Sequence, residues 1–466
     1  MLFRYLVVAG ICLAVSHASA QERPFPQHLK YPYGFIPATI TDLQVRNEFI
    51  RWKSALVTEC SGGYRVECDN SGAETKVEAI GFGMLTAAIF GDKDLFDGLY
   101  KFYKSKLAGG GMMGWKVTCD AISDQSSATD GDVEVAFALI MASWQWPATS
   151  YLTDAKTVIG NLKKVVVTCG NLKALAMGYG NSGVYGGCNE TDISYYNPAA
   201  FRLFAKACGN ATDSAMWIKL AADTYTILKA GANSTTGLVP ERQSTGGQPG
   251  SGDYGSYKYD ACRTPWRIAM DYVWNGNKEA EAWLKKISAW AYGFGISKIK
   301  EGFTLSGSVL GTYHPVCFVG GFGIAAMAGS QAMVDEFGTD MAKIRDLNWF
   351  PQSLSPLYLA LITGNQFRND ITEKRSDVGI VAGPAAYVNN AWPTVRCAGD
   401  RISISELAAG HAITVTMLSG VRVARLSGGN GATAVITTGA LKRGCYVISL
   451  TDAAGHALET RTIAVY

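Results

Sequence analysis

SSATDGDVEVAFALIMASWQW, from Ser126 to Trp146, is the stretch of this chain from which its architecture follows. Between Val133 and Trp146 eleven of fourteen residues are apolar, and the exceptions are Glu134, Ser143 and Gln145. A surface helix shows one apolar stripe, whereas a helix that is apolar nearly all round is buried. The stretch therefore predicts a helix that other elements surround on most sides.

Polar residues gather at the start of this helix. Ser127, Thr129, Asp130 and Asp132 lie within six residues of one another. Such side chains cap the free backbone N–H groups of a helix, and acids are favoured at the positive end of its dipole. A buried helix can instead present carboxylates to the floor of a cleft. The stretch alone leaves both interpretations open.

Helix-length apolar segments recur between residues 41 and 364, separated by loops rich in Gly, Ser and Asp. Little of the alternating pattern typical of strands lies between them, so we predict an all-α architecture. Hydrophobic residues make up 48% of the 466-residue chain, which is typical of a globular protein with a large core. About twelve helices are expected, near residues 42–57, 75–90, 93–107, 130–146, 152–167, 196–208, 212–230, 263–274, 277–292, 315–335, 337–347 and 353–363.

The first twenty residues have the pattern of a secretory signal. Arg4 precedes an apolar run, and Ala18-Ser19-Ala20 forms a small-x-small cleavage site. The mature protein is expected to begin near Gln21 and to lie outside the cytoplasm. The net charge of +3 is nearly neutral for this length, so we expect no nucleic-acid partner.

The cysteines fit an oxidising compartment. Of the eleven, ten remain once Cys12 leaves with the signal. Cys60 and Cys68 are close enough in sequence to staple a Gly-rich loop, and Cys397 with Cys445 would tie the C-terminal region together. The chain has no CxxC, and the histidines of the mature protein are scattered singly, so we expect no zinc site. They are His28, His314, His411 and His456.

The pattern changes after Asn365. Residues 369–392 lack periodicity and contain Pro384, which predicts a linker. Short runs with strand character follow at 412–418, 421–426, 432–438, 445–450 and 459–466, separated by turn residues. We therefore expect a signal at 1–20, a helical domain at 21–368, the linker at 369–392, and a small all-β, sandwich-like domain at 393–466.

Two further acids lie in settings that suit chemistry. Glu78 enters the second predicted helix beside Val77, Ala79 and Ile80, and apolar neighbours disfavour the charged form of a carboxyl group, as a general acid needs. Asp260 precedes Arg263 and Arg267, and nearby arginines keep an Asp ionised, as a general base requires. The structural alternative for each acid is an ordinary carboxylate at a helix start, favoured by the helix dipole. In this interpretation Asp260 pairs with Arg263 or Arg267.

Acids from separate helices, together with aromatic loops, suggest one chemistry above others. Glycoside hydrolysis uses a carboxylic acid on the leaving oxygen and a second carboxylate for water or nucleophile. Aromatic faces stack on sugar rings, and several aromatic residues lie in or beside the Gly-rich loops. These are Trp115, Tyr185, Tyr195, Tyr196, Tyr254 and Tyr257. Loop packing is the alternative role for each.

Residues 128–140, ATDGDVEVAFALI, with Ala142 and Trp146, closely resemble the signature of glycoside hydrolase family 8. Further landmarks follow in order: residues 78–84, 95–97, 114–116, 194–198, 259–263 and 313–314. The likeness covers roughly residues 24–368. It implies an (α/α)6 barrel, in agreement with the helix count, and inversion at the anomeric carbon without metal or cofactor.

The resemblance also implies roles for single residues. Glu78 looks like the general acid and Asp260 like the general base. Asp130 looks like the acid that holds and distorts the sugar at the cleavage point. The remaining residues would bind or position the substrate: Trp115 by stacking on a sugar, Tyr195 near the catalytic water, Arg263 by holding Asp260, and Asp132 and Tyr259 beside the substrate.

The acid motif departs from the usual family pattern. Val77 and Ile80 stand where a polar Ser and Gln are usual, so the hydrogen bonding around Glu78 and the adjoining subsite are expected to differ. An inverting mechanism also needs the two carboxyl groups about 6.5–9.5 Å apart, to leave room for water.

The C-terminal end resembles the sorting domains of the type IX secretion system. Gly444-Cys445-Tyr446 and the terminal strand-like run to Tyr466 carry the likeness. It implies export across an outer membrane, with the secretion machinery as a partner and the cell surface or the medium as destination. A carbohydrate-binding or merely structural sandwich is the alternative.

Taken together, the residues and the resemblance favour an endo-β-1,4-glucanase acting on cellulose or mixed-linkage β-glucan. The Thr129-Asp130-Gly131-Asp132 form goes with glucanase-type members of the family. A chitosanase or xylanase of the same family is the first alternative, and a non-catalytic carbohydrate-binding protein is the second. We expect a monomer whose partner is a β-1,4-linked polysaccharide.

Overall fold

The computed structural model describes residue 23, residues 25–69, 71–146 and 150–367, and seven strands beyond residue 393. The chain divides into two compact units, Met1–Glu373 and Lys374–Tyr466. The predicted signal at 1–20 and the predicted linker at 369–392 lie outside the described residues. In the described part of the chain, no helix is long and apolar enough to cross a membrane.

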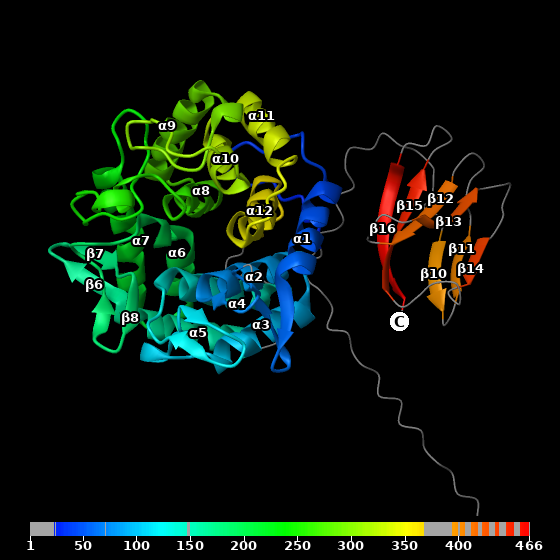
Figure 1. Cartoon of the computed structure of the whole chain (residues 1–466), viewed down its shortest axis with the longest axis horizontal. Coiled ribbons are helices and arrows are strands. Elements are labelled where there is room, and N and C mark those ends of the chain that lie inside the picture. The colour runs from blue at the N-terminus through cyan, green and yellow to red at the C-terminus, as the bar shows by residue number, and fades with distance from the viewer. Residues whose placement is uncertain are drawn as a thin grey trace, which may run out of the picture. The chain divides into compact units, whose positions relative to one another are not determined.

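Twelve α-helices make up most of the described part of the first unit (Figure 1). They are α1 (Asp42–Leu56), α2 (Val77–Phe90), α3 (Lys93–Ser105), α4 (Thr129–Gln145), α5 (Ser150–Leu162), α6 (Pro198–Ala207), α7 (Ala211–Gly231), α8 (Thr264–Asn275), α9 (Lys278–Phe294), α10 (Val316–Ala325), α11 (Gln331–Met341) and α12 (Trp349–Ile362). Ten of them match the predicted segments closely, and α10 and α11 do not.

The predicted helix over 315–335 is wrong. The chain leaves α10 through a 3-10 turn at Ala326–Ala328, and α11 begins at Gln331, earlier than the predicted 337–347. The Ser330 side chain accepts a hydrogen bond from the Met333 N–H and caps the new helix. The apolar run hid this start, because only the small Ser marks it in the sequence.

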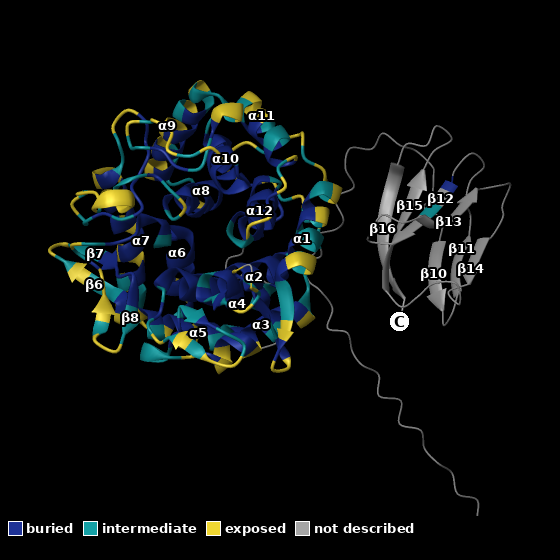
Figure 2. Ribbon diagram, in the orientation of Figure 1, coloured by how far each residue is buried: buried dark blue, intermediate teal, exposed yellow. Residues whose placement is uncertain are grey.

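Alternate helices form a closed ring. Helices α2, α4, α6, α8, α10 and α12 each contact the next, and α12 contacts α2 again. The odd-numbered helices pack on the outside of this ring: α3, α5, α7, α9 and α11 each contact the inner helix that precedes them, and α1 contacts α12. Figure 2 shows the inner helices almost wholly buried, as their apolar faces predict. This arrangement is consistent with the expected (α/α)6 barrel.

Two glycines bring α2 and α4 close together. A Cβ atom on Gly131 would lie 2.6 Å from the Val77 carbonyl carbon and 2.7 Å from the Glu78 nitrogen. A Cβ atom on Gly81 would lie 2.8 Å from the Gly131 oxygen. Real Cβ atoms do not approach so closely, so only glycine lets the two helix starts meet. Gly321 is a third close-packing residue, because a Cβ there would lie 2.6 Å from the Cys262 oxygen.

Short antiparallel strands lie in the connections between the helices. They are β1 (Val57–Cys60) with β2 (Gly63–Val66), β3 (Thr75–Lys76) with β4 (Lys116–Val117) and β5 (Ile122–Asp124), β6 (Val166–Cys169) with β7 (Leu172–Leu175), and β8 (Gly178–Gly180) with β9 (Gly183–Tyr185). The sequence did not predict these hairpins, which are too short to show a two-residue period.

The disulfide expected between Cys60 and Cys68 is wrong. Cys60 pairs with Cys119, and Cys169 pairs with Cys188. Cys68 lies beyond the end of β2 as a buried thiol whose sulfur accepts the Lys76 N–H at 3.3 Å. The suggested Cys397–Cys445 pair falls where the structure describes no side chains.

The second unit contains two antiparallel sheets in its described strands. One has the order β10 (Thr394–Ala398), β11 (Arg401–Ser405), β14 (Ala434–Thr437). The other has the order β13 (Arg422–Ser427), β12 (Ala412–Met417), β15 (Gly444–Thr451), β16 (Ala457–Val465). Five of these strands match predicted runs, and β10 and β11 were not predicted.

Candidate active site

A cleft of about 710 Å³ opens where the inner helices α2 and α4 begin. Glu78 and Asp130 reach it from the first turns of these helices. Asp260 and Arg263 reach it from the turn before α8. The cleft therefore collects the three acids that the sequence placed more than 50 residues apart from one another.

The start of α4 decides between the two interpretations of its acids. Its N-cap residue is Ala128, and no side chain caps the helix there. The Asp130 side chain is only 2% exposed and accepts a 2.5 Å hydrogen bond from Nη1 of Arg263. The capping interpretation of Asp130 is therefore wrong, and this carboxylate belongs to the cleft.

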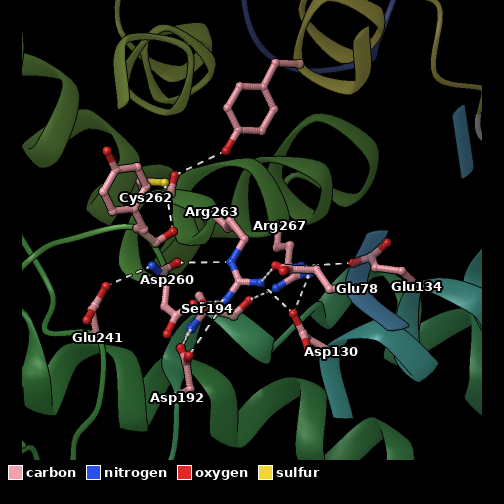
Figure 3. Close-up of polar contacts among 12 residues, drawn as sticks. Glu78, Asp130, Glu134, Asp192, Ser194, Glu241, Asp260, Cys262, Arg263 and Arg267 are labelled. Carbon is pink, nitrogen blue, oxygen red and sulfur yellow. Dashed lines mark hydrogen bonds and ion pairs between the residues drawn. The ribbon is translucent and has the colours of Figure 1, made fainter. Parts of the chain in front are cut away.

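One guanidinium group joins the acids of the cleft, as Figure 3 shows. Nη1 of Arg263 donates to Glu78 as well as to Asp130. Nη2 donates to Oδ1 of Asp260 at 2.8 Å and to Oγ of Ser194 at 3.0 Å. Arg263 is only 1% exposed, so these acceptors, rather than water, compensate its buried charge. Its expected contact with Asp260 is present.

A second arginine lies behind the first. Nε of Arg267 donates to Oε1 of Glu134 at 2.9 Å, and both side chains are fully buried. Nη2 of Arg267 lies 3.8 Å from Oδ2 of Asp130. Of the two arginines considered as partners of Asp260, Arg263 is therefore the one that pairs with it, and Arg267 faces α4.

Burial shapes the protonation of these acids. It raises the pKa of Asp130 to about 7, against the opposing effect of Arg267, and the charge of Asp260 adds to the rise. Burial also raises the pKa of Asp260 and of Asp192. Five carboxyl groups lie around two guanidinium groups here, and burial, which disfavours the charged form, raises the pKa of four of them, Asp130, Glu134, Asp192 and Asp260. The fifth is Glu78.

Aromatic side chains flank the acids. Trp115 and Tyr195 both line the cleft. The guanidinium carbon of Arg263 lies 5.5 Å from the Tyr195 ring centre, and Nζ of Lys76 lies 6.0 Å from the Trp115 ring centre. The Val77 N–H donates to the Trp115 carbonyl at 3.1 Å, which ties this aromatic residue to the start of α2.

Asp132 lies elsewhere than expected. It is fully buried and does not line the cleft. Its Oδ1 accepts hydrogen bonds from the Tyr103 hydroxyl at 2.6 Å and the Met113 N–H at 3.1 Å. Two positions along a helix turn a side chain by about 200°, so Asp130 and Asp132 point to opposite sides.

Tyr259 also stays outside the cleft lining. It is 40% exposed, and its ring packs edge-on against Phe318 and Phe350, with centres 5.4 Å and 5.9 Å away. The family resemblance had implied a place for Tyr259 beside the substrate. The structure brings together the other predicted site residues.

Two further acids support the site and were missed. Asp192 is buried, accepts the Ser194 N–H at 2.8 Å, and lies 3.8 Å from Nη2 of Arg263. Glu241 accepts the backbone N–H of Asp260 at 3.0 Å, and burial followed by the charge of Asp260 raises its pKa to about 7. Asp192 stands two residues before the noted landmark 194–198, which could have revealed it. Glu241 gave no such signal.

Comparisons with known proteins identify the family of the chain. The family model described as glycosyl hydrolases family 8 matches residues 24–354. Endoglucanase C of Ruminiclostridium cellulolyticum is 34% identical over 389 residues, which cover 78% of this chain and 82% of that protein. A β-glucanase of Niallia circulans is 32% identical over 386 residues, covering 74% and 92%.

Solved structures share the fold. The apo structure of a β-1,3-1,4-glucanase from Paenibacillus sp. X4 superposes with a TM-score of 0.68 and 29% identity, covering 74% of this chain and 99% of that one. A GH8 xylobiose complex from Teredinibacter turnerae superposes with a TM-score of 0.62 and 19% identity, covering 70% and 95%. At that identity the second likeness is one of fold alone.

Proposed function

The chain belongs to glycosyl hydrolases family 8 and is a glycoside hydrolase, and from this premise we propose that it is an endo-β-1,4-glucanase acting on cellulose or mixed-linkage β-glucan. One observation carries the proposal: Glu78, Asp130 and Asp260 share a single cleft and a single guanidinium group, that of Arg263. The endoglucanase and β-glucanase names of the relatives support the choice of polymer.

Asp260 suits the part of the general base. Its side chain is 37% exposed, so water from the cleft reaches the carboxylate. The 2.8 Å hydrogen bond from Arg263 stabilises its ionised form and fixes the direction of its free oxygen. In the proposed reaction Asp260 takes a proton from a water molecule as that water attacks the anomeric carbon.

Glu78 is proposed as the general acid that protonates the leaving oxygen. Its side chain is 15% exposed at the cleft, whereas Arg263 behind it is buried. Glu78 is proposed to carry its proton once a sugar separates it from the guanidinium group, because loss of this ion pair disfavours the ionised form of the carboxyl group. Val77 and Ile80, both buried beside it, offer no competing polar group.

The remaining cleft residues are proposed to hold the sugar. Asp130, at the floor, would accept hydrogen bonds from hydroxyl groups of the ring at the cleavage point. The Trp115 ring would stack on a neighbouring sugar, and the Tyr195 hydroxyl would lie near the attacking water. With water rather than a carboxylate as the nucleophile, the product forms with inverted anomeric configuration.

Reducing-sugar release from four polymers tests the function: carboxymethyl cellulose, barley β-glucan, xylan and chitosan. We expect release from the two glucans, and a loss of about 10²–10⁴-fold in kcat for Glu78→Gln, the contribution typical of general acid catalysis. Glu59→Gln makes the same change at an exposed strand residue outside the cleft and should leave the rate unchanged. Glucanase activity would be excluded by release from xylan or chitosan alone.

The stereochemistry has its own measurement. Proton NMR recorded during the first minutes of hydrolysis distinguishes the α from the β anomer of the new reducing end. The proposal requires the α anomer first, with the β anomer appearing by mutarotation. A β anomer at the earliest time points would show retention and would assign a nucleophilic role to one of the carboxylates.

We also propose that the protein is exported, with the second unit as its sorting signal. The signal-like residues 1–20 and the likeness of residues 444–466 to type IX sorting domains support this. Expression with and without residues 374–466, in a bacterium that carries this secretion system, tests it. Activity in the medium or at the cell surface should depend on those residues.

A further inference from the structure

Part of the cleft wall is a covalently closed loop. The disulfide between Cys169 and Cys188 joins residues 19 positions apart, with their Cα atoms 5.3 Å from each other. The chain between them forms β7, β8 and β9. Met177 and residues 180–185, all within this loop, line the cleft. A large share of the wall therefore lies inside one disulfide-bonded ring.

The inner strand of this wall is fixed without the disulfide. The Ser127 N–H donates to the Tyr179 carbonyl, and the Thr129 N–H donates to the Met177 carbonyl, both at 2.9 Å. A Cβ atom on Gly178 would lie 2.1 Å from the Ser127 carbonyl oxygen, so glycine alone allows this approach. These bonds dock β8 on the segment that leads directly into Asp130.

The outer strand has fewer restraints. Among the described strands, β9 pairs with β8 alone, from Gly178 opposite Tyr185 to Gly180 opposite Gly183. Tyr185 is 53% exposed. Gly186 and Gly187 follow, with φ values of +79° and +125° that side-chain-bearing residues rarely adopt. The Tyr185 carbonyl accepts the Met177 N–H at 2.9 Å, and the Gly187 N–H donates to the Glu190 carbonyl at 2.6 Å. Cys188 is held by its disulfide and by the Thr245 N–H, which donates to its carbonyl at 2.9 Å.

The reacting groups belong to other elements. Glu78 lies on α2, and Asp260 and Arg263 lie in and next to the turn before α8. None of them lies within the loop that the disulfide closes. A change in the position of β9 therefore alters how the polymer is held and leaves the acid and base in place.

We propose that the Cys169–Cys188 disulfide holds β9 in its substrate-binding position and thereby sets the affinity of the cleft for polysaccharide. The inference rests on the proposed function for the nature of the polymer. Without the cross-link, the two positive-φ glycines let β9 move, and the substrate must order the strand when it binds. Ordering a few side chains and backbone torsions lowers affinity roughly tenfold and has no effect on the later cleavage step.

The test compares two disulfides. The double variant Cys169→Ser/Cys188→Ser is expected to raise KM for barley β-glucan about tenfold while kcat stays within about twofold of wild type. The matched control is Cys60→Ser/Cys119→Ser, which removes the other described disulfide, neither of whose cysteines lines the cleft. Its KM should equal that of wild type. Each double variant is also combined with Glu78→Gln, which prevents cleavage. Titration of a cello-oligosaccharide into these proteins then measures affinity directly.

The outcomes separate clearly. Unchanged KM and affinity in the Cys169/Cys188 variant overturn the inference, as does a fall in kcat with KM unchanged. An equal rise of KM in both double variants also overturns it, because it indicates general loosening. Circular dichroism checks the fold, and the pair Cys169→Ala/Cys188→Ala replaces the serines if they prevent folding. If wild type cleaves no glucan, the proposed function fails, and the same comparison is made on the polymer that it does cleave.

Discussion

At Arg263, one buried side chain satisfies carboxylates that come from α2, from α4 and from the turn before α8. The guanidinium group suits this part, because its planar fork offers donors in fixed directions and it keeps its charge when buried. Lysine would supply one point charge and could not span the same acceptors. The net charge of the whole chain, +3, does not reveal this local concentration of charged side chains.

Asp132 makes a prediction about stability at the same scale. Burial raises its pKa from the ordinary value of 3.8 to about 7, so the folded protein binds this proton more tightly than the unfolded chain. Asp132 therefore lowers the free energy of unfolding as pH rises from about 4 to 7. By the constant of about 1.4 kcal/mol per pKa unit, the loss reaches at most about 4 kcal/mol.

Asp132→Asn keeps the shape of the side chain and removes the titration. Urea unfolding at several pH values should show a smaller loss of stability between pH 4 and pH 7 in the variant than in wild type. Asp130, Glu134 and Glu241 contribute shifts of the same sign to both proteins. Parallel stability curves for the two proteins would show that Asp132 is ionised in the fold.

At the scale of elements, the contact between α2 and α4 places Glu78 beside Asp130. Gly131→Ala puts a methyl group against the Val77 and Glu78 backbone, so the helices must separate. We expect a destabilisation of about 1–3 kcal/mol and a clear fall in kcat. Thermal unfolding and β-glucan hydrolysis measure the two effects.

Gly160→Ala is the matched control for that change. Gly160 lies in the outer helix α5, and a Cβ atom there would meet nothing within 4 Å. Alanine should therefore stabilise α5 by up to about 1 kcal/mol, with activity unchanged. If both substitutions had the same effect, close packing at Gly131 would not explain the position of the acids.

The sequence predicted the helices better than the boundaries and cross-links between them. The apolar helix at 133–146 and the acids Glu78, Asp130 and Asp260 could be found because helix periodicity and the family motifs are local patterns. Helix counting missed the start of α11, which a single Ser marks. The Cys60–Cys119 pair was out of reach because it joins the end of β1 to the turn between β4 and β5, 59 residues further along the chain. The side on which Tyr259 lies depends on packing that no local pattern records, whereas the opposite directions of Asp130 and Asp132 follow from helix geometry.

At the scale of the whole molecule, the catalytic machinery belongs to the first unit alone. Every residue that lines the cleft lies between Lys76 and Arg263, and the family match ends at residue 354. A chain that stops at residue 373 is therefore expected to hydrolyse β-glucan with kcat and KM within about twofold of the full chain. A loss of activity that correlates with unfolding would show that the second unit stabilises the first.

The contact between α12 and α2 has a consequence for how the protein is made. It joins segments some 270 residues apart, so ring closure is a highly non-local event, and contacts of this kind slow folding. During synthesis the acids of α2 and α4 leave the ribosome long before α12 does. In refolding from denaturant, helical circular dichroism is expected to return before hydrolytic activity, because the inner wall behind the cleft is complete only when its last helix has joined its first.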